Sequence, residues 1–141
     1  MTQEDMQLLL TDLCARLTYG VICQVDDGAA GLNDGKLVEI DISKERVRFD
    51  ADYYWEAYID EVKPYLRSMS SMTKDEEKEY NSFIKGVEPF DSDFSAYPKE
   101  YKFVYEFDIK NYIDWLNAHH FDYRELIPKG LALEAPEGMY N

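Results

Sequence analysis

One stretch of the sequence, residues 107–136, constrains the fold most, because it holds a capped amphipathic helix and both histidines. Asp108 is a favourable N-cap residue, since its carboxylate can accept hydrogen bonds from the free backbone N–H groups of a first helical turn. The apolar residues that follow have the spacing of a helix with one buried face: Ile109, Tyr112, Ile113 and Leu116. Trp115 and His119 lie four residues apart beside this stripe. We therefore predict a helix that begins at Asp108 and carries two half-covered rings.

The same stretch continues with a second start signal. Asp122 and Glu125 have the spacing of a capping box, and Pro128 would end the resulting short turn of helix within a few residues. Residues 131–135 follow Gly130 and are expected to form a final extended segment.

Four short motifs give the chain a resemblance to a family. They are KPYLR (63–67), MSSMT (69–73), DWLNAHHFDYR (114–124) and KGLALEAP (129–136). They resemble sequences of small uncharacterised acidic proteins from gut Bacteroidales and their phages or mobile elements. The resemblance covers the second half of the chain well and the region before Lys63 poorly. It implies an association with mobile elements, but no catalytic or binding residues and no known function. Members commonly have a proline after the arginine of KPYLR, where this chain has Ser68.

The first half of the chain predicts a helix followed by antiparallel strands. Thr2 and Asp5 form a capping box, apolar residues then recur at helical spacing, and Gly20 supplies a left-handed end. Residues 21–25 are typical of a strand, and residues 26–35 of a turn-rich loop. A return strand is expected to place one set of alternating apolar residues in the core: Val38, Ile40 and Ile42. After a turn at residues 43–45, Val47 and Phe49 continue the alternation into a second hairpin.

The middle and later segments are less regular. Residues 53–59 fit either a strand or a helix, and we favour the strand because Pro64 would break a longer helix. Residues 60–66 are then expected to form a single helical turn. Thr73 and Glu76 form the clearest capping box in the sequence and start another helix. Residues 88–99 read as a loop, and the period-two alternation of residues 101–107 predicts a strand.

These elements define an α+β fold in a single domain, residues 1–141. We expect an N-terminal helix, a small bent antiparallel β-meander, with an SH3-like barrel as the alternative, and later helices packed on the sheet. The loop at residues 88–100 is the one place where the chain would divide. The oligomeric state stays open, since residues 101–107 as an edge strand would be able to pair with a second copy.

Charge and cysteine usage limit the possible functions. A net charge of −14 argues against direct binding to nucleic acid or to anionic membranes, because both require cationic side chains. Cys14 and Cys23 form no CxxC pair and are expected to be buried free thiols, with a disulfide or a reactive thiol as alternatives. Acidic residues near the N-terminus do not suit a signal peptide, and no apolar run reaches membrane-spanning length. We therefore expect a cytoplasmic protein.

The sequence contains no recognisable metal, cofactor or catalytic motif. Adjacent residues on a helix point about 100° apart, so His119 and His120 cannot both bind one ion unless the helix has already ended. The expected roles are capping of the helix C-terminus by one ring and packing of the other at the core edge. An ion held by Asp26, Asp27 and Asp34 is a minor alternative to a solvated hairpin loop. HExxH, GxSxG, GxxxxGK[ST] and GxGxxG are all absent.

We therefore favour a non-enzymatic accessory or interaction module whose acidic surface meets a basic protein. The residues expected to contact a partner are Trp115, His119, His120, Tyr123 and Arg124. The alternatives are a small hydrolase or transferase with a site assembled from scattered residues such as Cys14, His119 and Asp122, or a purely structural component.

Overall fold

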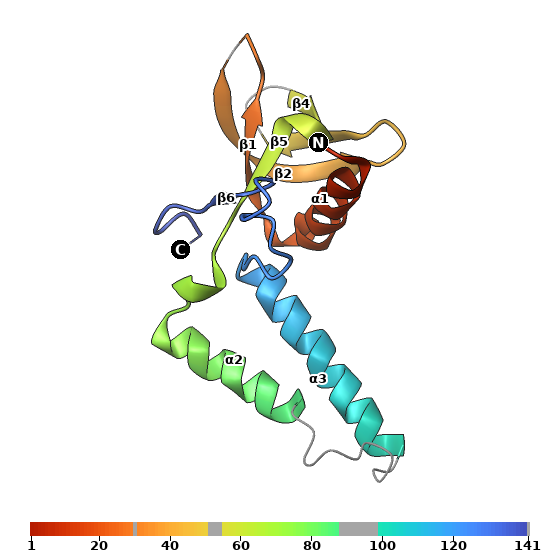
Figure 1. The fold of residues 1–141 in the computed structure, drawn as a ribbon, viewed down its shortest axis with the longest axis vertical. Helices are drawn as coiled ribbons and strands as arrows, with labels where there is room; N and C mark the ends of the chain where they lie inside the picture. Colours follow the sequence, from red (N-terminus) through yellow and green to blue (C-terminus); the bar gives the residue numbers. More distant parts are fainter. Residues whose placement is uncertain (30, 51–54, 88–98, 141) are drawn as a thin grey trace.

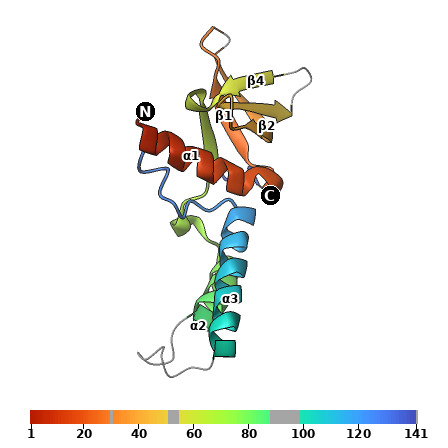
Figure 2. The same cartoon turned by 90° about the vertical axis from the view of Figure 1, so that its right-hand side faces the viewer.

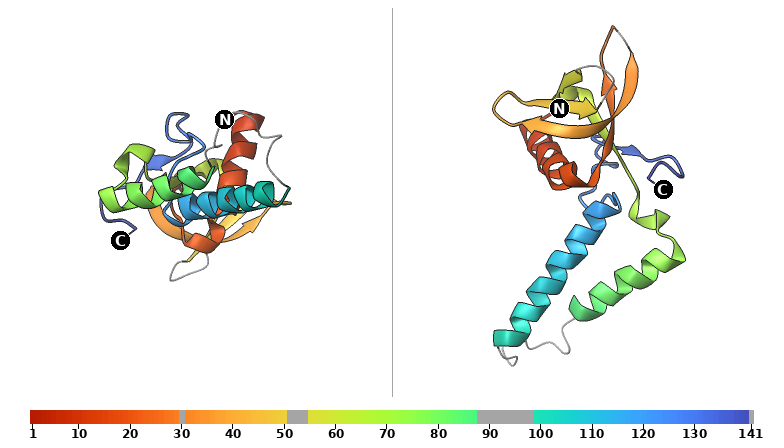
Figure 3. Two further views of the ribbon diagram at one scale, coloured as in Figure 1. Left: turned by 90° about the horizontal axis from the view of Figure 1, so that it is seen from below. Right: turned by 180° about the vertical axis from the view of Figure 1, so that it is seen from behind.

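The computed structural model of the chain confirms an α+β fold with an N-terminal helix, a six-stranded sheet and later helices (Figure 1). It describes residues 1–29, 31–50, 55–87 and 99–140, with the backbone alone at 84–87 and 99–108. The N-terminal helix and the sheet form a compact part that we call the head. Two later helices, which we call the helical arm, extend away from it (Figures 1 and 2, and the right-hand view of Figure 3). Among the described helices, none combines the length and the apolar character that a membrane span requires.

Helix α1 (Gln3–Arg16) begins and ends where its capping signals predict. The hydroxyl oxygen of Thr2 accepts a hydrogen bond from the Asp5 N–H at 3.0 Å, and the Asp5 carboxylate accepts one from the Thr2 N–H at 3.4 Å. A 3₁₀ turn, η1 (Leu17–Tyr19), continues the helix until Gly20, whose φ of 72° is in the left-handed region that favours glycine. Helix α1 lies across one face of the sheet (Figure 2).

The sheet has the strand order β4-β3-β2-β1-β5-β6. Its strands are β1 (Ile22–Asp26), β2 (Leu32–Asp41), β3 (Arg46–Asp50), β4 (Trp55–Tyr58), β5 (Val62–Leu66) and β6 (Leu133–Glu134). The first four form the predicted antiparallel meander, and β5 returns antiparallel beside β1. The short strand β6 adds in parallel to β5, so the sheet is mixed. The SH3-like barrel is not formed, because the described strands form an open sheet with β4 and β6 at its two ends.

The core lies between α1 and the sheet. Leu9 and Leu13 of α1 are completely buried and pack in one cluster with apolar side chains of β1, β2, β3 and β5. The C-terminal segment completes this cluster with Leu126, Leu131 and Ala132. The amphipathic pattern of α1 therefore predicts the burial of Leu9 and Leu13, but not that of Asp12 and Arg16, and Cys14 of the same pattern is exposed.

Strand β2 differs from its predicted form. It begins at Leu32, inside the predicted loop, and a register shift between Leu37 and Glu39 changes which residues face the core. Leu37 is buried, whereas Val38 and Ile42 are 43% and 63% exposed, so the prediction that both face the core is wrong. Gly35 allows the backbone of β2 to lie close to the Trp55 ring, because a Cβ at this position would be only 2.4 Å from that ring.

The segment between β4 and β5 also corrects a prediction. The strand preference for residues 53–59 is confirmed at Trp55–Tyr58, while residues 53 and 54 lie outside the described part of the chain. The expected helical turn at residues 60–66 is wrong: a 3₁₀ turn, η2 (Ile59–Glu61), is followed by strand β5. Pro64 is buried in β5 and lies opposite Cys23 of β1, in the antiparallel pairing that also joins Val62 to Val25.

The helical arm consists of α2 (Lys74–Val87) and α3 (Lys99–Ala118). The Thr73 and Glu76 capping box that starts α2 is confirmed, with backbone-to-side-chain bonds of 3.0 and 3.2 Å. The predicted strand at residues 101–107, and the helix start at Asp108, are wrong because α3 already begins at Lys99. The edge through which a second copy was expected to pair is therefore not a strand. Residues 88–98, most of the predicted loop, lie outside the described residues.

Segment 121–130 contains turns rather than the predicted short helix. Asp122 does cap this segment, but its two carboxylate oxygens accept hydrogen bonds from the backbone N–H groups of Leu126 and Ile127, at 2.8 and 2.9 Å. Glu125 has a φ of 61°, which excludes the regular helical geometry that a capping box needs. The predicted final extended segment is confirmed as β6.

The arm is fastened to the head by an ion pair at the start of α2. Both terminal nitrogens of Arg67, the residue after β5, bond the Glu76 carboxylate at 2.8 and 2.7 Å. The guanidinium group also lies 4.3 Å from the centre of the buried Phe121 ring. The hydrogen bonds from Arg67 hold the pKa of Glu76 down to about 2.

We expect Glu76→Gln to lower the free energy of unfolding by about 1 kcal/mol at neutral pH, because the arginine loses a charged bidentate partner. Since the folded state depresses the pKa of Glu76, this contribution is complete above pH 4.5 and is lost as the pH falls towards 2. Urea unfolding of both proteins across this range measures it. A difference that stays constant with pH would contradict the assignment, and Glu77→Gln on the exposed side of α2 is the control.

Candidate functional site

The five residues predicted to contact a partner lie together where α3 ends against the head. Trp115 is half-buried, and its Nε1 donates a hydrogen bond to the Glu79 carboxylate of α2 at 2.7 Å. The Nδ1 of His119 donates to the Trp115 carbonyl oxygen at 2.9 Å, and the centres of the two rings are 4.3 Å apart. His119 therefore caps the end of the helix, as expected for one of the two histidines.

His120 lies just past the end of α3 and is buried, with a φ of 62°. Its ring stacks on the ring of Tyr140, with centres 3.7 Å apart and planes 19° apart. Its Nδ1 is buried without a hydrogen-bond partner in the described structure. Burial, and then the positive charge of Arg16, lower the pKa of His120 to about 4, so that the ring is neutral at pH 7.

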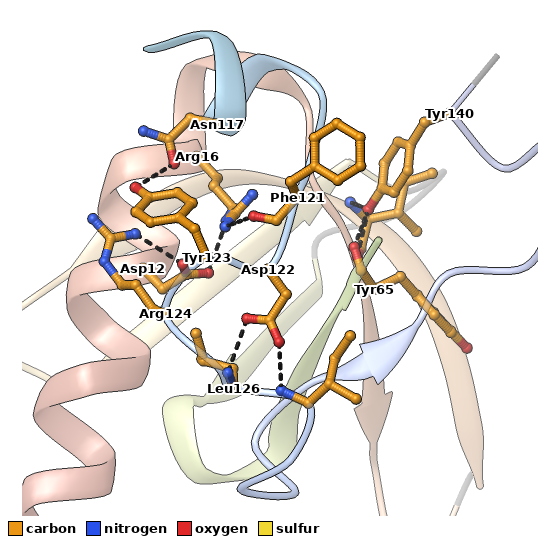
Figure 4. Close-up of polar contacts among 12 residues, drawn as sticks. Asp12, Arg16, Tyr65, Asn117, Phe121, Asp122, Tyr123, Arg124, Leu126 and Tyr140 are labelled. Atoms are coloured by element: carbon orange, nitrogen blue, oxygen red, sulfur yellow. Dashed lines mark hydrogen bonds and ion pairs between the residues drawn. The ribbon is translucent and has the colours of Figure 1, made fainter. Parts of the chain in front are cut away.

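Tyr123 and Arg124 belong to a buried ionic cluster with two residues of α1 (Figure 4). Asp12 accepts hydrogen bonds from Arg16 Nε and from an Arg124 terminal nitrogen, both at 2.9 Å. Arg16 also donates to the Phe121 carbonyl oxygen at 2.6 Å. Both arginine side chains lie beside the Tyr123 ring, at 5.5 and 4.6 Å from its centre.

Asp12 and Arg16 were not predicted as site residues, although both are completely buried. A signal for them was present. They are four residues apart in α1 and flank Leu13 on the same helical face, so a charged pair occupies the buried stripe. The Asp12 carboxylate of this pair also bonds Arg124, a second cation from the segment after α3.

The residues of the alternative enzymatic site are used structurally or point elsewhere. Both oxygens of Asp122 cap the following turn, and His119 Nδ1 caps α3. Cys14 is exposed, which corrects the expectation of a buried thiol, whereas Cys23 is buried and burial raises the pKa of its thiol. Within the described ranges, no group of three or more histidine, cysteine or acidic residues could hold a metal ion.

A second candidate site is a groove between the β1–β2 hairpin and the segment that enters β5. We call it the acidic groove, because four of its lining residues are acidic and exposed: Asp26, Asp27, Asp60 and Glu61. Lys63 is the single cationic residue in the lining, and Gln24, Gly28, Leu32 and Leu133 complete it. The groove has a volume of about 490 Å³. It is therefore large enough to receive a long side chain or a short stretch of peptide.

The loop aspartates are divided between two environments. Asp26 accepts a hydrogen bond from the Gly28 N–H at 3.0 Å, at the mouth of the acidic groove. Asp34 lies within β2 and accepts one from the Tyr65 hydroxyl at 2.9 Å. The alternative in which Asp26, Asp27 and Asp34 hold an ion together is therefore not supported by their placement. The groove instead combines aspartates of this loop with acidic residues from η2.

Comparison of the chain with protein-family models, with curated proteins and with solved structures gave no match.

Proposed function

We propose that the chain is a non-enzymatic interaction module that binds a basic protein at the acidic groove. The observation that carries the proposal is the groove lining, which contains four exposed acidic residues and one lysine. In this proposal the module acts in the cytoplasm, as the acidic N-terminal residues predict, and the motif resemblance associates it with gut Bacteroidales and their phages or mobile elements.

The chemistry of the lining favours a lysine or arginine side chain on the partner. Its cationic end would meet the carboxylates, and its aliphatic stem would lie on Leu32 and Leu133. Leu32 is 63% exposed, which is a large apolar area for a residue at the end of a strand. Opposite charges of this kind mainly accelerate association and select the partner.

The test uses a short fluorescent peptide rich in lysine and arginine, with binding followed by anisotropy at low and at moderate salt. We expect the double variant Asp27→Asn/Asp60→Asn to weaken binding about tenfold, a free-energy change of about 1.4 kcal/mol. Neither side chain takes part in a hydrogen bond or ion pair with other described residues, so the fold should be unaffected.

The matched control is Asp75→Asn/Glu77→Gln, which changes the net charge equally on the exposed first turn of α2. The proposal requires the control to bind like the parent protein. Equal weakening in both double variants would mean that the peptide responds only to the total charge, and the groove would then not be the site.

A further inference from the structure

Residues 133–140 form a strap along the edge of the sheet, directly after Leu131 and Ala132, which belong to the core. We call this segment the C-terminal strap. Its strand β6 has only two residues and pairs with the end of β5, and the Ala135 N–H donates to the Leu66 carbonyl oxygen at 2.7 Å. An isolated two-residue pairing is weak, so the strap depends on its other contacts with the head.

Tyr140 is the principal of these contacts. Its hydroxyl donates to the Tyr65 carbonyl oxygen at 2.6 Å and accepts from the Ile22 N–H at 3.0 Å, so one side chain joins β5 to β1 (Figure 4). The ring of Tyr140 rests on the ring of His120. The end of the strap is therefore held by two hydrogen bonds and one ring stack.

The surroundings of His120 do not accommodate a positive charge. Arg16 of α1, Arg67 after β5 and the neighbouring His119 all disfavour protonation of the ring. The nearby carboxylates are committed to other groups: Asp12 to Arg16 and Arg124, Glu76 to Arg67, and Asp122 to backbone N–H groups. Tyr140, which faces the ring, is itself desolvated and lies near the buried Cys23. A proton on His120 thus adds a buried charge beside an Nδ1 that has no partner.

We propose that His120 and Tyr140 form a proton-sensitive latch, which releases the C-terminal strap from β5 when His120 is protonated while the rest of the head stays folded. Release exposes the protonated His120 ring to water, which screens it from Arg16 and Arg67. It costs the short β6 pairing, the hydrogen bond from Ser68 to Glu134 and the contacts of Tyr140, while Leu131 and Ala132, which precede the strap, stay in the core.

The direction of the pH effect follows from linkage. In the docked form burial, and then the positive charge of Arg16, lower the pKa of His120 to about 4 from the ordinary 6.5. The docked form is therefore favoured at neutral pH, and this advantage declines as the pH falls from 6.5 to 4, the range in which release is expected.

The experiment is methyl NMR of protein labelled at its five methionines, titrated from neutral to acid pH. Met139 reports on the strap, where it is half-buried, and Met6 reports on the packing of α1 against the core. We expect the Met139 methyl signal to move to the position of an exposed methionine between pH 6.5 and pH 4 while the Met6 signal stays in place. Joint movement of both signals would indicate unfolding of the whole head and would overturn the proposal.

Two variants assign the titrating group. His120→Phe keeps a ring against Tyr140 but cannot be protonated, so the Met139 step should disappear, whereas His119→Gln should retain it. Persistence of the step in His120→Phe would also overturn the proposal. Tyr140→Leu removes the latch from the other side, and its Met139 signal at neutral pH should resemble that of the parent protein in acid. This variant decides the matter should His120→Phe fail to fold.

The latch also bears on the acidic groove, and this part rests on the proposed function. Leu133 of the strap lines the groove, so release of the strap removes one of its walls. Tyr140→Leu should therefore weaken binding of the basic peptide severalfold at neutral pH. The two proposals fail separately: a protein that binds no peptide leaves the Met139 titration intact, and unchanged peptide binding in Tyr140→Leu contradicts only the coupling.

Discussion

Replacement of Asp12 by alanine is expected to lower the free energy of unfolding by about 3–5 kcal/mol. Asp12 is completely buried and accepts hydrogen bonds from both Arg16 and Arg124. Without it, the guanidinium group of Arg16, which is also completely buried, keeps a single acceptor, the Phe121 carbonyl oxygen. An unpaired buried charge is far more costly than a lost surface ion pair. Urea unfolding followed by circular dichroism measures the difference.

The control for this prediction is an exposed ion pair of the sheet. Arg46 bonds Glu56 at 3.0 Å with both side chains partly exposed, and Arg46→Ala should cost less than about 1 kcal/mol. The double variant Asp12→Ala/Arg16→Met should recover part of the stability lost in Asp12→Ala, because it removes the charge as well as its partner. A loss below about 1 kcal/mol in Asp12→Ala would show that Arg16 does not depend on this carboxylate.

Replacement of Phe121 by alanine is also expected to lower the free energy of unfolding, by about 3–5 kcal/mol. The ring is completely buried at the place where α3, β5 and the C-terminal segment meet. It stacks on the Trp115 ring, with ring centres 5.6 Å apart. The guanidinium carbon of Arg67 lies 4.3 Å from the centre of the Phe121 ring. Truncation would leave a cavity between the head and the arm and deprive both neighbours of their contact surface.

Phe121→Leu serves as the matched variant, because it retains most of the volume and should cost clearly less. The backbone contacts of residue 121 are the same in both variants, including the carbonyl oxygen that accepts from Arg16. Equal losses in the two variants would attribute the effect to the aromatic stacking rather than to the cavity. Unfolding in urea, compared at constant m-value, separates these outcomes.

The elements predicted correctly from the sequence are those defined by local signals. Both capping boxes that start α1 and α2 use side chains three residues apart, so their hydrogen bonds form within one turn. The amphipathic stripe of α1 and the alternation of Val47 and Phe49 in β3 are similarly local. Such patterns need no information about distant parts of the chain.

The errors arise where distant contacts decide the structure. Residues 101–107 alternate in period two, yet they belong to a twenty-residue helix that pairs with α2. The exposure of Val38 depends on a register shift against β3, and the strand character of Val62–Leu66 depends on pairing with β1 and β6. In each case the local pattern was compatible with two structures, and the partner element selected one.

The candidate site was predictable in part. The five residues predicted from the motif around the two histidines lie where α3 meets the head. Their side chains contact other residues of the chain there. The acidic groove was not anticipated, because Asp26 and Asp27 lie at the end of β1 and just after it, whereas Asp60 and Glu61 lie in η2, more than thirty residues further along the sequence. Because acidic residues are frequent along the whole chain, the sequence does not single out the four that come together in the groove.

The contacts that close the head also dictate when it can be completed during synthesis. The helical arm is inserted between β5 and Phe121, and the bridge between Arg67 and Phe121 joins the two ends of the insertion. When residues 1–66 have left the ribosome, the residues of α1 and of five strands are available. The Phe121 carbonyl oxygen that accepts from Arg16 lies 105 residues further along the chain than Arg16, and the Tyr140 hydroxyl that accepts from Ile22 lies 118 residues beyond Ile22. The nascent head is thus a nearly finished sheet with an open edge and an incompletely paired buried arginine. The head therefore closes only when residues 121–140 become available to supply these partners.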